Sequence, residues 1–398
     1  MWLWRVAGWA NIILREHSLP DHYFAYGDAE KSCKVLRDDA GELAFCEDAI
    51  QATLNGRNII LVSCDTNRYE WNTVMGPLNR PDSRGTLWVV DYLNGERLQK
   101  IELAGYAHPD FHPLGLALYD NTLFVVNHRK ARSTIEVFEF EETASSFTAR
   151  HVRTVSGWWL LSPNGISPTS ASSFYITQDH LFTRRLPFPL SPILTTLETM
   201  LMLPLGWVNH VTLSTDPATP VTVAWSAFGI PFPNGVAISD SGTQVAVSSS
   251  SRGLLVMFNR DPATNQLVRE TSLQLPFGPD NVGFDAGKFI VGGHPNLPKL
   301  KAVARRDPGV SSGSWVATVE QRVGPRDAVA DDLHAPRSAD SLMRQDDKYV
   351  VRTVYQSSGQ GGGLKTSTGG VLDEENGKFF APGLYADGLL VCQFRAGL

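Results

Sequence analysis

Pro233-Asn234-Gly235-Val236-Ala237-Ile238 opens a segment that continues through a polar turn into Gln244-Val245-Ala246-Val247. The same order of Pro-x-Gly, apolar run, polar turn and apolar run occurs earlier, from Pro113 to Asn127. Both segments continue into a third apolar run and, after a polar loop, into a fourth. Four short strands joined by turns form one blade of a β-propeller, so each segment predicts a blade.

Comparable segments recur along the chain, at intervals that suit blades of about 40 to 50 residues with insertions. The runs are short, rich in β-branched and aromatic residues, and separated by turn residues, which is typical of consecutive strands. The sequence therefore predicts an all-β fold, a six-bladed β-propeller of four-stranded blades with short capping helices, as a single domain over residues 33–398. The blade openings lie near Glu47, Leu114, Asn164, Asn234, Asp280 and Ser367.

Composition agrees with one large β domain. The 398 residues are 42% hydrophobic, which is enough for a sizeable core, and the 34 Gly and 24 Pro indicate many turns. The formal net charge of -6 gives no basic surface, so nucleic acid is not an expected partner.

Two insertions interrupt the repeat, near residues 183–210 and 300–348. Within the first, Ile193 to Leu203 is apolar and predicts a short helix over one face of the propeller, with packing into the core as the favoured interpretation. The second, from Arg305 to Lys348, is polar and predicts a long surface excursion.

Residues 1–32 form an apolar N-terminal segment that contains three tryptophans and is interrupted by Arg5. Its apolar run is shorter than the roughly 20 residues of a membrane-spanning helix. A signal-peptide core, an interfacial anchor and a docked terminal segment all fit this pattern. We therefore expect a secreted, ER-lumenal or membrane-associated protein, with peripheral contact to membrane or lipid through this segment; the sequence does not indicate an oligomeric state.

The cysteines do not suggest a disulfide scaffold, because Cys33, Cys46, Cys64 and Cys392 are few and scattered. Cys33 and Cys392 lie near opposite ends of the chain, where the first and last strands of a closed propeller meet. A bridge there would contribute about 5 kcal/mol in the loop-entropy model. From spacing alone, such a bridge and two buried free thiols remain equally open.

Amide and carboxylate side chains recur at the blade openings, just before apolar strands. Calcium takes six to eight oxygen ligands and accepts Asp, Glu and Asn side chains readily. Asn-Gly is also a strong hairpin signal, but both Pro-Asn-Gly segments precede a strand at a repeat opening, which favours ligands over turns. The predicted ligands of one central calcium ion are Glu47, Asn164, Asn234, Asp280 and Asn281.

A calcium ion facing a cavity can polarise a carbonyl group and stabilise the oxyanion that forms when water attacks it. Hydrolysis of an ester or lactone is the reaction that this chemistry favours. It needs a general base, for which histidine is the usual choice near neutral pH. The histidines next to blade motifs are His112, His128, His180 and His294.

With these residues in hand, the chain resembles the serum paraoxonase and arylesterase family of calcium-dependent six-bladed propellers. The resemblance runs from Cys33 to Cys392, interrupted by the two insertions. Its landmarks are the Glu47-Asp48 pair, Val125-Val126-Asn127-His128, Asn164, Asp179-His180, Asn234-Gly235, Asp280-Asn281 and Gly293-His294-Pro295-Asn296.

The resemblance implies that the five predicted ligands hold the catalytic calcium and that Cys33 and Cys392 form a disulfide. It also implies a second, structural calcium that uses Asp48, the carbonyl of Leu116 and an Asp where this chain has Gly165, so the second ligand set is incomplete.

The family's histidine dyad falls at Leu114 and His128, and only His128 is present. His112, two residues from Leu114, or Asp280 are the alternative candidates for the base, together with a metal-bound water.

The resulting hypothesis is a calcium-dependent hydrolase of small-molecule lactones and aryl esters, with promiscuous phosphotriesterase activity. A gluconolactonase-type hydrolase of sugar lactones is an alternative. A non-catalytic propeller that binds calcium for stability and serves as a binding module is another, and Leu114 favours it. Propellers similar to strictosidine synthase lack this ligand set.

Overall fold

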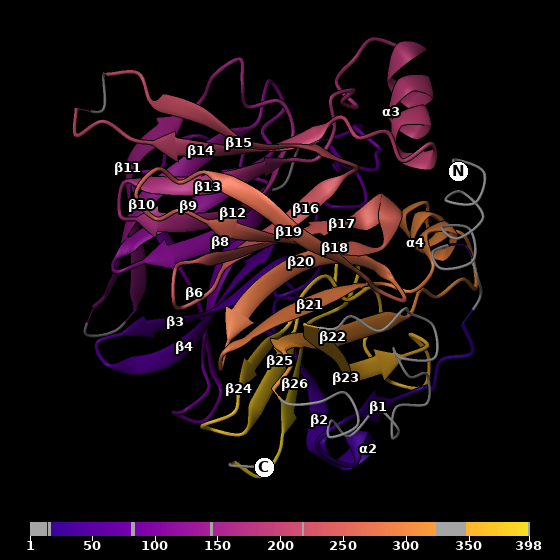
Figure 1. Cartoon of the computed structure of the whole chain (residues 1–398). Coiled ribbons are helices and arrows are strands. Elements are labelled where there is room, and N and C mark those ends of the chain that lie inside the picture. Colours follow the sequence, from indigo (N-terminus) through magenta and orange to yellow (C-terminus); the bar gives the residue numbers. More distant parts are fainter. Residues whose placement is uncertain are drawn as a thin grey trace. The chain divides into compact units, whose positions relative to one another are not determined.

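The computed structural model describes Leu14 and residues 17–80, 84–143, 146–216, 219–323 and 348–396 (Figure 1). The chain divides into two compact units, one of residues 37–236 and one of residues 1–36 with 237–398. Strands are far more frequent than helices in both units.

The unit of residues 37–236 contains three sheets, in which successive strands pair antiparallel. A short strand, β7 (Glu102–Ala104), pairs in parallel with the last strand of one of these sheets, β11 (Phe147–Val155). The sheets are β3 (Cys46–Leu54), β4 (Arg57–Cys64), β5 (Thr86–Asp91) and β6 (Arg97–Lys100); β8 (Pro113–Tyr119), β9 (Thr122–Asn127), β10 (Thr134–Glu142) and β11 (Phe147–Val155); and β12 (Pro163–Ser170), β13 (Ser173–Gln178), β14 (Gly206–Thr212) and β15 (Thr222–Ile230).

The other unit also contains three sheets. The first of them begins with β16 (Pro233–Ile238), and residues 233–236 of this strand are counted with the unit of residues 37–236. Strand β1 (Tyr23–Phe24) pairs antiparallel with β23 (Tyr349–Ser357), at the edge of the sheet that contains β23. The sheets are β16 (Pro233–Ile238), β17 (Gln244–Ser249), β18 (Leu254–Arg260) and β19 (Leu267–Gln274); β20 (Gly278–Asp285), β21 (Lys288–His294), β22 (Ser314–Gln321) and β23 (Tyr349–Ser357); and β24 (Val371–Asp373), β25 (Lys378–Ala381), β26 (Leu389–Gln393) and β2 (Cys33–Leu36).

Six sheets with a four-stranded antiparallel core therefore occur in the described residues, and the predicted class, a six-bladed β-propeller, is confirmed. Five predicted blade openings lie within two residues of the start of β3, β8, β12, β16 or β20. The sixth is less regular, because Ser367 forms only an isolated bridge with Gly383 and β24 begins at Val371.

Local sequence explains the hairpins inside the blades. Asn55-Gly56 joins β3 to β4 and Ala286-Gly287 joins β20 to β21, and all four residues have positive φ. Two left-handed residues in a two-residue loop match the twist of the flanking strands. Apolar side chains of β3–β5 and β8–β11 then pack into one core cluster, around Phe111, Phe138 and Phe140.

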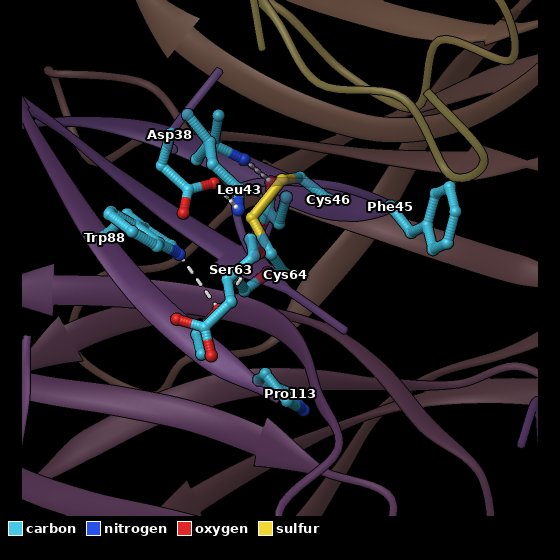
Figure 2. The surroundings of a disulfide bond; sticks show 12 residues. Asp38, Leu43, Phe45, Cys46, Ser63, Cys64, Trp88 and Pro113 are labelled. Carbon is cyan, nitrogen blue, oxygen red and sulfur yellow. Dashed lines mark hydrogen bonds between the residues drawn. A yellow bond between two sulfur atoms is a disulfide. The ribbon is translucent and has the colours of Figure 1, made fainter. Parts of the chain in front are cut away.

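The predicted disulfide between Cys33 and Cys392 is present, with its sulfurs 2.04 Å apart. It lies between β2 and β26, so strands from opposite ends of the chain complete one sheet. A second disulfide joins Cys46 and Cys64 across β3 and β4, and Figure 2 shows it. The expectation that the cysteines form no disulfide framework is therefore wrong, because antiparallel pairing places Cys46 directly opposite Cys64.

In the part of the chain that the structure describes, three short α-helices accompany the sheets: α2 (Ala29–Ser32), α3 (Leu190–Met200) and α4 (Leu297–Ala304). Helix α3 lies in the first predicted insertion and tolerates Pro192 in its first turn, where no backbone N–H is required. A 3-10 turn, η1 (Ser250–Arg252), follows β17.

The expected packing of α3 into the core is wrong, because its apolar side chains are exposed. Leu190 and Ile193 are each 51% exposed and Leu197 is 46% exposed. The buried side of the helix is polar and includes Thr195 and Glu198. The carboxylate of Glu198 accepts the backbone N–H groups of residues 181 and 182, at 2.9 and 2.8 Å, and so anchors the polar side.

The second predicted excursion, from Arg305 to Lys348, contains the buried strand β22, in which Trp315 is fully buried. Residues 324–347 of this excursion, and residues 1–13 and 15–16 of the apolar N-terminal segment, lie outside the described residues. Among the described helices, none has the length and hydropathy needed to cross a membrane.

Candidate functional site

The five predicted calcium ligands all lie near the start of the first strand of a sheet. Glu47 is in β3, Asn164 in β12 and Asn234 in β16, while Asp280 and Asn281 are in β20. Each side chain is buried, with between 2% and 6% of its surface exposed. Burying carboxylates and amides is costly unless they are hydrogen-bonded or bind a metal.

An irregularity in strand pairing marks these positions. The register shifts between Cys46 and Asp48, between Pro163 and Ile166, and between Pro279 and Val282. A bulge of this kind leaves residues outside the regular ladder and changes the direction of their side chains. It explains how polar ligands can occur inside strands that are otherwise buried and apolar.

The alternative that Pro-Asn-Gly forms hairpin turns is excluded for both segments. Asn164-Gly165 and Asn234-Gly235 lie within β12 and β16, and none of these four residues has a positive φ. Other Asn-Gly pairs do lie in turns, namely Asn55-Gly56, Asn94-Gly95 and Asn376-Gly377.

Within the unit of residues 37–236, glycines let neighbouring strand openings approach closely. A Cβ atom on Gly115 of β8 would lie 2.4 Å from the carbonyl oxygen of Asn164, and one on Gly165 would lie 2.7 Å from that of Asn234. The hydroxyl of Thr177 donates to the carbonyl oxygens of Gly165 and Asn234. The openings of β8, β12 and β16 therefore adjoin in this order.

Asn164 has an acceptor oxygen with no hydrogen-bond partner among the described residues. Its amide nitrogen donates to Oδ2 of Asp179 at 3.2 Å, whereas its Oδ1 is buried and receives no donor. Buried acceptors are almost always satisfied, so this oxygen suits a cation that the structure does not contain. An amide oxygen of this kind is a ligand that calcium accepts.

In the described residues, no group of three or more His, Cys, Asp or Glu side chains is arranged to hold a metal ion. The predicted calcium set does not require one, because three of its five members are asparagines: Asn164, Asn234 and Asn281.

The opening of β20 is held through its backbone. The hydroxyl of Ser248 donates to the carbonyl oxygen of Asp280, and that of Ser250 donates to the carbonyl oxygen of Pro279 at 2.6 Å. The N–H of Asn281 donates to Thr368 at 2.7 Å. These bonds fix the main chain at the opening of β20.

His112 is held between two carboxylates. Its Nδ1 lies 2.8 Å from Oδ2 of Asp65, and its Nε2 lies 3.3 Å from Oδ1 of Asp110. Burial by itself would lower the pKa of His112, but the bonds to Asp110 and Asp65 outweigh it and raise the pKa to about 9. At neutral pH this imidazole is a cation, which cannot accept a proton as a general base.

His128 is neutral but has both ring nitrogens in hydrogen bonds. Burial lowers its pKa to about 4, and the bond to Pro163 only partly opposes this effect. The Nε2–H group donates to the carbonyl oxygen of Pro163 at 2.7 Å, so Nδ1 accepts from the hydroxyl of Thr73. His128 is therefore a fixed support behind Pro163 and Asn164.

Neither Leu114 nor His180 supplies the missing base. Leu114 is buried, and its carbonyl oxygen accepts the hydroxyl of Ser63 at 2.6 Å. His180 is hydrogen-bonded at Nδ1 to Asp179 and at Nε2 to Thr199 of α3, each at 2.9 Å.

His294 makes a hydrogen bond with one of its two ring nitrogens, as His112 does, but its other nitrogen forms no ion pair with a carboxylate in the described residues, whereas Nε2 of His112 lies 3.3 Å from Asp110. Nε2 of His294 lies 2.9 Å from Oδ2 of Asp280, and its buried Nδ1 has no hydrogen-bond partner among the described residues. The pairing of Gly278 with His294 across β20 and β21 places it there. The Gly293-His294-Pro295 motif can be recognised in the sequence. The sequence does not show that Nδ1 of His294 has no hydrogen-bond partner in the described residues.

The second, structural calcium site does not fit this chain. Both carboxylate oxygens of Asp48 accept backbone N–H groups, from Ala49 at 2.9 Å and from Leu116 at 3.0 Å. Gly165 supplies no side chain, and no side chain fits there because of the contact with the main chain of Asn234. Asp48 therefore joins the openings of β3 and β8 directly.

The fold and these residues define a class of protein: a six-bladed propeller whose blade openings carry buried Asp, Glu and Asn side chains and a histidine. The sequence model of the arylesterase family matches residues 76–329. The chain belongs to this family, and hence to a class of ester and lactone hydrolases.

Individual relatives agree with this assignment. Serum paraoxonase/arylesterase 2 of Rattus norvegicus is 30% identical over 290 residues, which cover 69% of this chain and 76% of that protein. The same protein of Canis lupus familiaris is 33% identical over 230 residues, 55% of this chain and 60% of that protein. Serum paraoxonase/lactonase 3 of Homo sapiens is 30% identical over 261 residues, 63% and 68% of the two chains.

Among solved structures, a gluconolactonase from Xanthomonas campestris aligns over 96% of this chain and 99% of its own, with 16% identity and a TM-score of 0.42. A similarity at this TM-score carries no argument about activity.

Proposed function

We propose that this protein is a calcium-dependent hydrolase of lactones and aryl esters. The observation that carries the proposal is the buried Oδ1 of Asn164, an acceptor oxygen without a hydrogen-bond partner in the described residues, at a blade opening. Family membership supports the reaction class, and the printed names of the relatives include both arylesterase and lactonase.

The proposed ligands of calcium are the five buried side chains at the blade openings. When bound, the ion polarises the substrate carbonyl group and stabilises the oxyanion formed by attack of water. The ligands carry a charge of -2 when both carboxylates are ionised, which balances the ion. They are Glu47, Asn164, Asn234, Asp280 and Asn281.

His294 is the proposed general base. With Nε2–H donating to the carboxylate of Asp280, the lone pair lies on Nδ1, which has no hydrogen-bond partner in the described part of the chain. Nδ1 removes a proton from the attacking water as its oxygen bonds to the carbonyl carbon, and the carboxylate of Asp280 stabilises the imidazolium. The C–O bond to the leaving alkoxide then breaks, and the alkoxide takes up the proton.

His112 and His128 have positioning roles in this scheme. The cationic His112 holds the loops of Asp65 and Asp110, and its carbonyl oxygen accepts the N–H of His128 at 3.0 Å. His128 in turn supports Pro163, next to Asn164.

The substrate is a small-molecule ester or lactone under this proposal, and phosphotriesters are slower substrates whose phosphoryl oxygen takes the place of the carbonyl oxygen. A non-catalytic binding module is the second candidate, and Leu114 favours it because it removes one histidine of the family's dyad.

The test is hydrolysis of phenyl acetate and of a panel of γ- and δ-lactones, including a sugar lactone, by the purified full chain with calcium and with chelator. Turnover of phenyl acetate and simple lactones that chelator abolishes supports the proposal. Calcium binding without turnover of any substrate would assign the chain to the non-catalytic alternative, and turnover of the sugar lactone alone would assign it to the gluconolactonase type.

A further inference from the structure

Two consecutive arginines, Arg184 and Arg185, lie in the loop that joins β13 to α3, within the unit of residues 37–236 (Figure 1). Both side chains are half-buried. The hydroxyl of Thr183 accepts the N–H of Arg185 at 3.3 Å, and the hydroxyl of Ser191 donates to the carbonyl oxygen of Arg184 at 2.9 Å. The main chain that carries the two guanidinium groups is therefore fixed.

The guanidinium of Arg184 has no ion-pair partner in the described residues. Its Nε donates to the carbonyl oxygen of Val74 at 3.4 Å, and neither Nη1 nor Nη2 forms a hydrogen bond with a described residue. Burial lowers the pKa of Arg184, and no neighbouring carboxylate opposes this effect. A half-buried cation without a counter-ion is costly, so an anion that reaches Nη1 and Nη2 would be stabilising.

Arg185 supplies a second positive charge in a fixed position. Its Nη1 donates to the carbonyl oxygen of Lys130 and its Nη2 to that of Arg129, each at 2.6 Å. The guanidinium lies over the ring of Trp71, 5.8 Å from the centroid. Burial lowers the pKa of Arg185 to about 10, and the charge of Asp110 only partly opposes this effect, so the side chain is a cation at neutral pH.

Asp110 does not neutralise the two arginines, because both of its carboxylate oxygens face other groups. Its Oδ2 accepts the N–H of Lys130 at 2.7 Å, and its Oδ1 lies 3.3 Å from Nε2 of the cationic His112. Asp110 forms no ion pair with Arg184 or Arg185. The positive charge of the loop is therefore available to a ligand.

Arg185 adjoins the candidate site through His128. The indole under the guanidinium, Trp71, donates from Nε1 to the carbonyl oxygen of His128 at 2.8 Å. The charge of Arg185 is close enough to help lower the pKa of His128. His128 in turn supports Pro163, next to the proposed calcium ligand Asn164.

Arg184 reaches the same histidine from another loop. Its partner Val74 directly follows Thr73, whose hydroxyl is hydrogen-bonded to Nδ1 of His128. Both guanidinium groups therefore lie beside the blade opening that carries Asn164, where a charged part of a substrate can meet them.

We propose that Arg184, with the charge of Arg185 beside it, binds a carboxylate group of the substrate. Nη1 and Nη2 of one guanidinium can donate two parallel hydrogen bonds, an arrangement that matches a planar carboxylate. The inference rests on the proposed hydrolytic function and names its substrate class: lactones and aryl esters that carry a carboxylate away from the carbonyl group that reacts.

The first test measures binding without hydrolysis. It is isothermal titration calorimetry of the full chain in calcium with 4-acetamidobenzoate and neutral 4-acetamidobenzamide, in which a stable amide replaces the ester. We expect saturable binding of the carboxylate, roughly tenfold tighter than that of the neutral probe, because a charge-assisted hydrogen bond discriminates by about this factor. Arg184→Gln should bring the two affinities together.

Arg184→Gln should fold, because the guanidinium makes one hydrogen bond to the described residues, at 3.4 Å. The matched control is Arg97→Gln, which also removes one positive charge. Arg97 is exposed and lies opposite Asp91, at the far end of β5 from the loop that contains Val74. The control should keep the preference for the carboxylate.

The second test compares kcat/KM for 4-acetoxybenzoate with that for 4-acetoxybenzamide. The ratio of the two values should be roughly tenfold higher in the parent than in Arg184→Gln, since the variant cancels the difference between the leaving groups. Hydrolysis of phenyl acetate with the same ratio in parent and variant overturns this inference and leaves the proposed function standing. Failure to hydrolyse any of these esters overturns the proposed function, while the calorimetry still decides whether Arg184 binds a carboxylate.

Three results of the calorimetry overturn the inference. They are an absence of saturable 4-acetamidobenzoate binding, equal affinities of the parent for the two probes, and a preference for the carboxylate that persists in Arg184→Gln. The last result would assign the carboxylate to the calcium ion instead.

Discussion

Nδ1 of His112 lies 2.8 Å from Oδ2 of Asp65, and both side chains are buried. Because the imidazolium of His112 also faces Asp110, these two carboxylates should make its charge contribute to the stability of the folded protein. Since the pKa of His112 is raised from 6.5 to about 9, the folded protein binds this proton more tightly than the unfolded chain.

The stability that His112 contributes should therefore be fully present below about pH 6.5 and be lost as the pH rises through about 9. The difference corresponds to about 3 kcal/mol at most. Denaturant unfolding of the parent and of His112→Gln at pH 6 and pH 9.5 measures it, with the exposed His108→Gln as control. A stability difference between parent and His112→Gln that stays constant across this range would contradict the prediction.

His294→Gln should lower kcat/KM for phenyl acetate roughly 100-fold or more, because general base catalysis typically contributes 10²–10⁴-fold. The melting temperature of His294→Gln should stay close to that of the parent, since Nδ1 of His294 has no hydrogen-bond partner in the described residues. His128→Gln should show the reverse pattern, a lower melting temperature with a smaller loss of rate, because both of its nitrogens support other residues. Equal losses of rate in the two variants would count against His294 as the base.

Asn164→Ala should remove the stabilisation by calcium. A ligand present at 100 times its Kd stabilises the folded state by about 2.7 kcal/mol, and loss of one ligand oxygen should abolish most of that effect. Thermal unfolding with calcium and with chelator measures it. Asn121→Ala, in an exposed turn, is the matched control. A parent protein whose melting temperature is the same in chelator would refute calcium binding itself.

One calcium ion per chain is expected rather than two. Asp48 already accepts two backbone N–H groups and Gly165 provides no ligand. Elemental analysis of protein purified in calcium and dialysed against dilute calcium counts the bound ions. Two tightly bound ions per chain would show that a second site forms from other residues.

The two disulfides should differ in their effect on stability. Cys46 and Cys64 are 18 residues apart and Cys33 and Cys392 are 359 apart, so the second bridge closes a far longer loop. The loop-entropy model gives about 3 kcal/mol for the shorter loop and nearly twice that for the longer one. Denaturant unfolding of Cys46→Ala/Cys64→Ala and Cys33→Ala/Cys392→Ala tests this order, and a thiol assay of the denatured parent should find no free thiol.

The blades and their openings could be predicted because the information is local. Apolar runs of strand length and turn residues between them recur along the chain, with Pro-x-Gly at three of the six openings, and a repeat of that kind predicts a propeller. The proposed calcium ligands were also chosen from the sequence, since Asn164 and Asn234 recur at equivalent points of the repeat. A register shift, such as the one between Pro163 and Ile166, leaves residues outside the regular strand pairing, which allows a polar residue such as Asn164 in an otherwise apolar strand.

Tertiary structure decided the rest, because hydrogen-bond partners far apart in the sequence determine what a side chain can do. His112 and His294 are both histidines near blade openings, yet Asp65 and Asp110 make one a cation while the other keeps an unpartnered Nδ1 in the described structure. The exposed apolar side of α3 depends on where Glu198 is anchored. The sequence by itself determined the fold class, because its repeat is local, and only the tertiary contacts determined which hydrogen bonds each of several similar histidines makes.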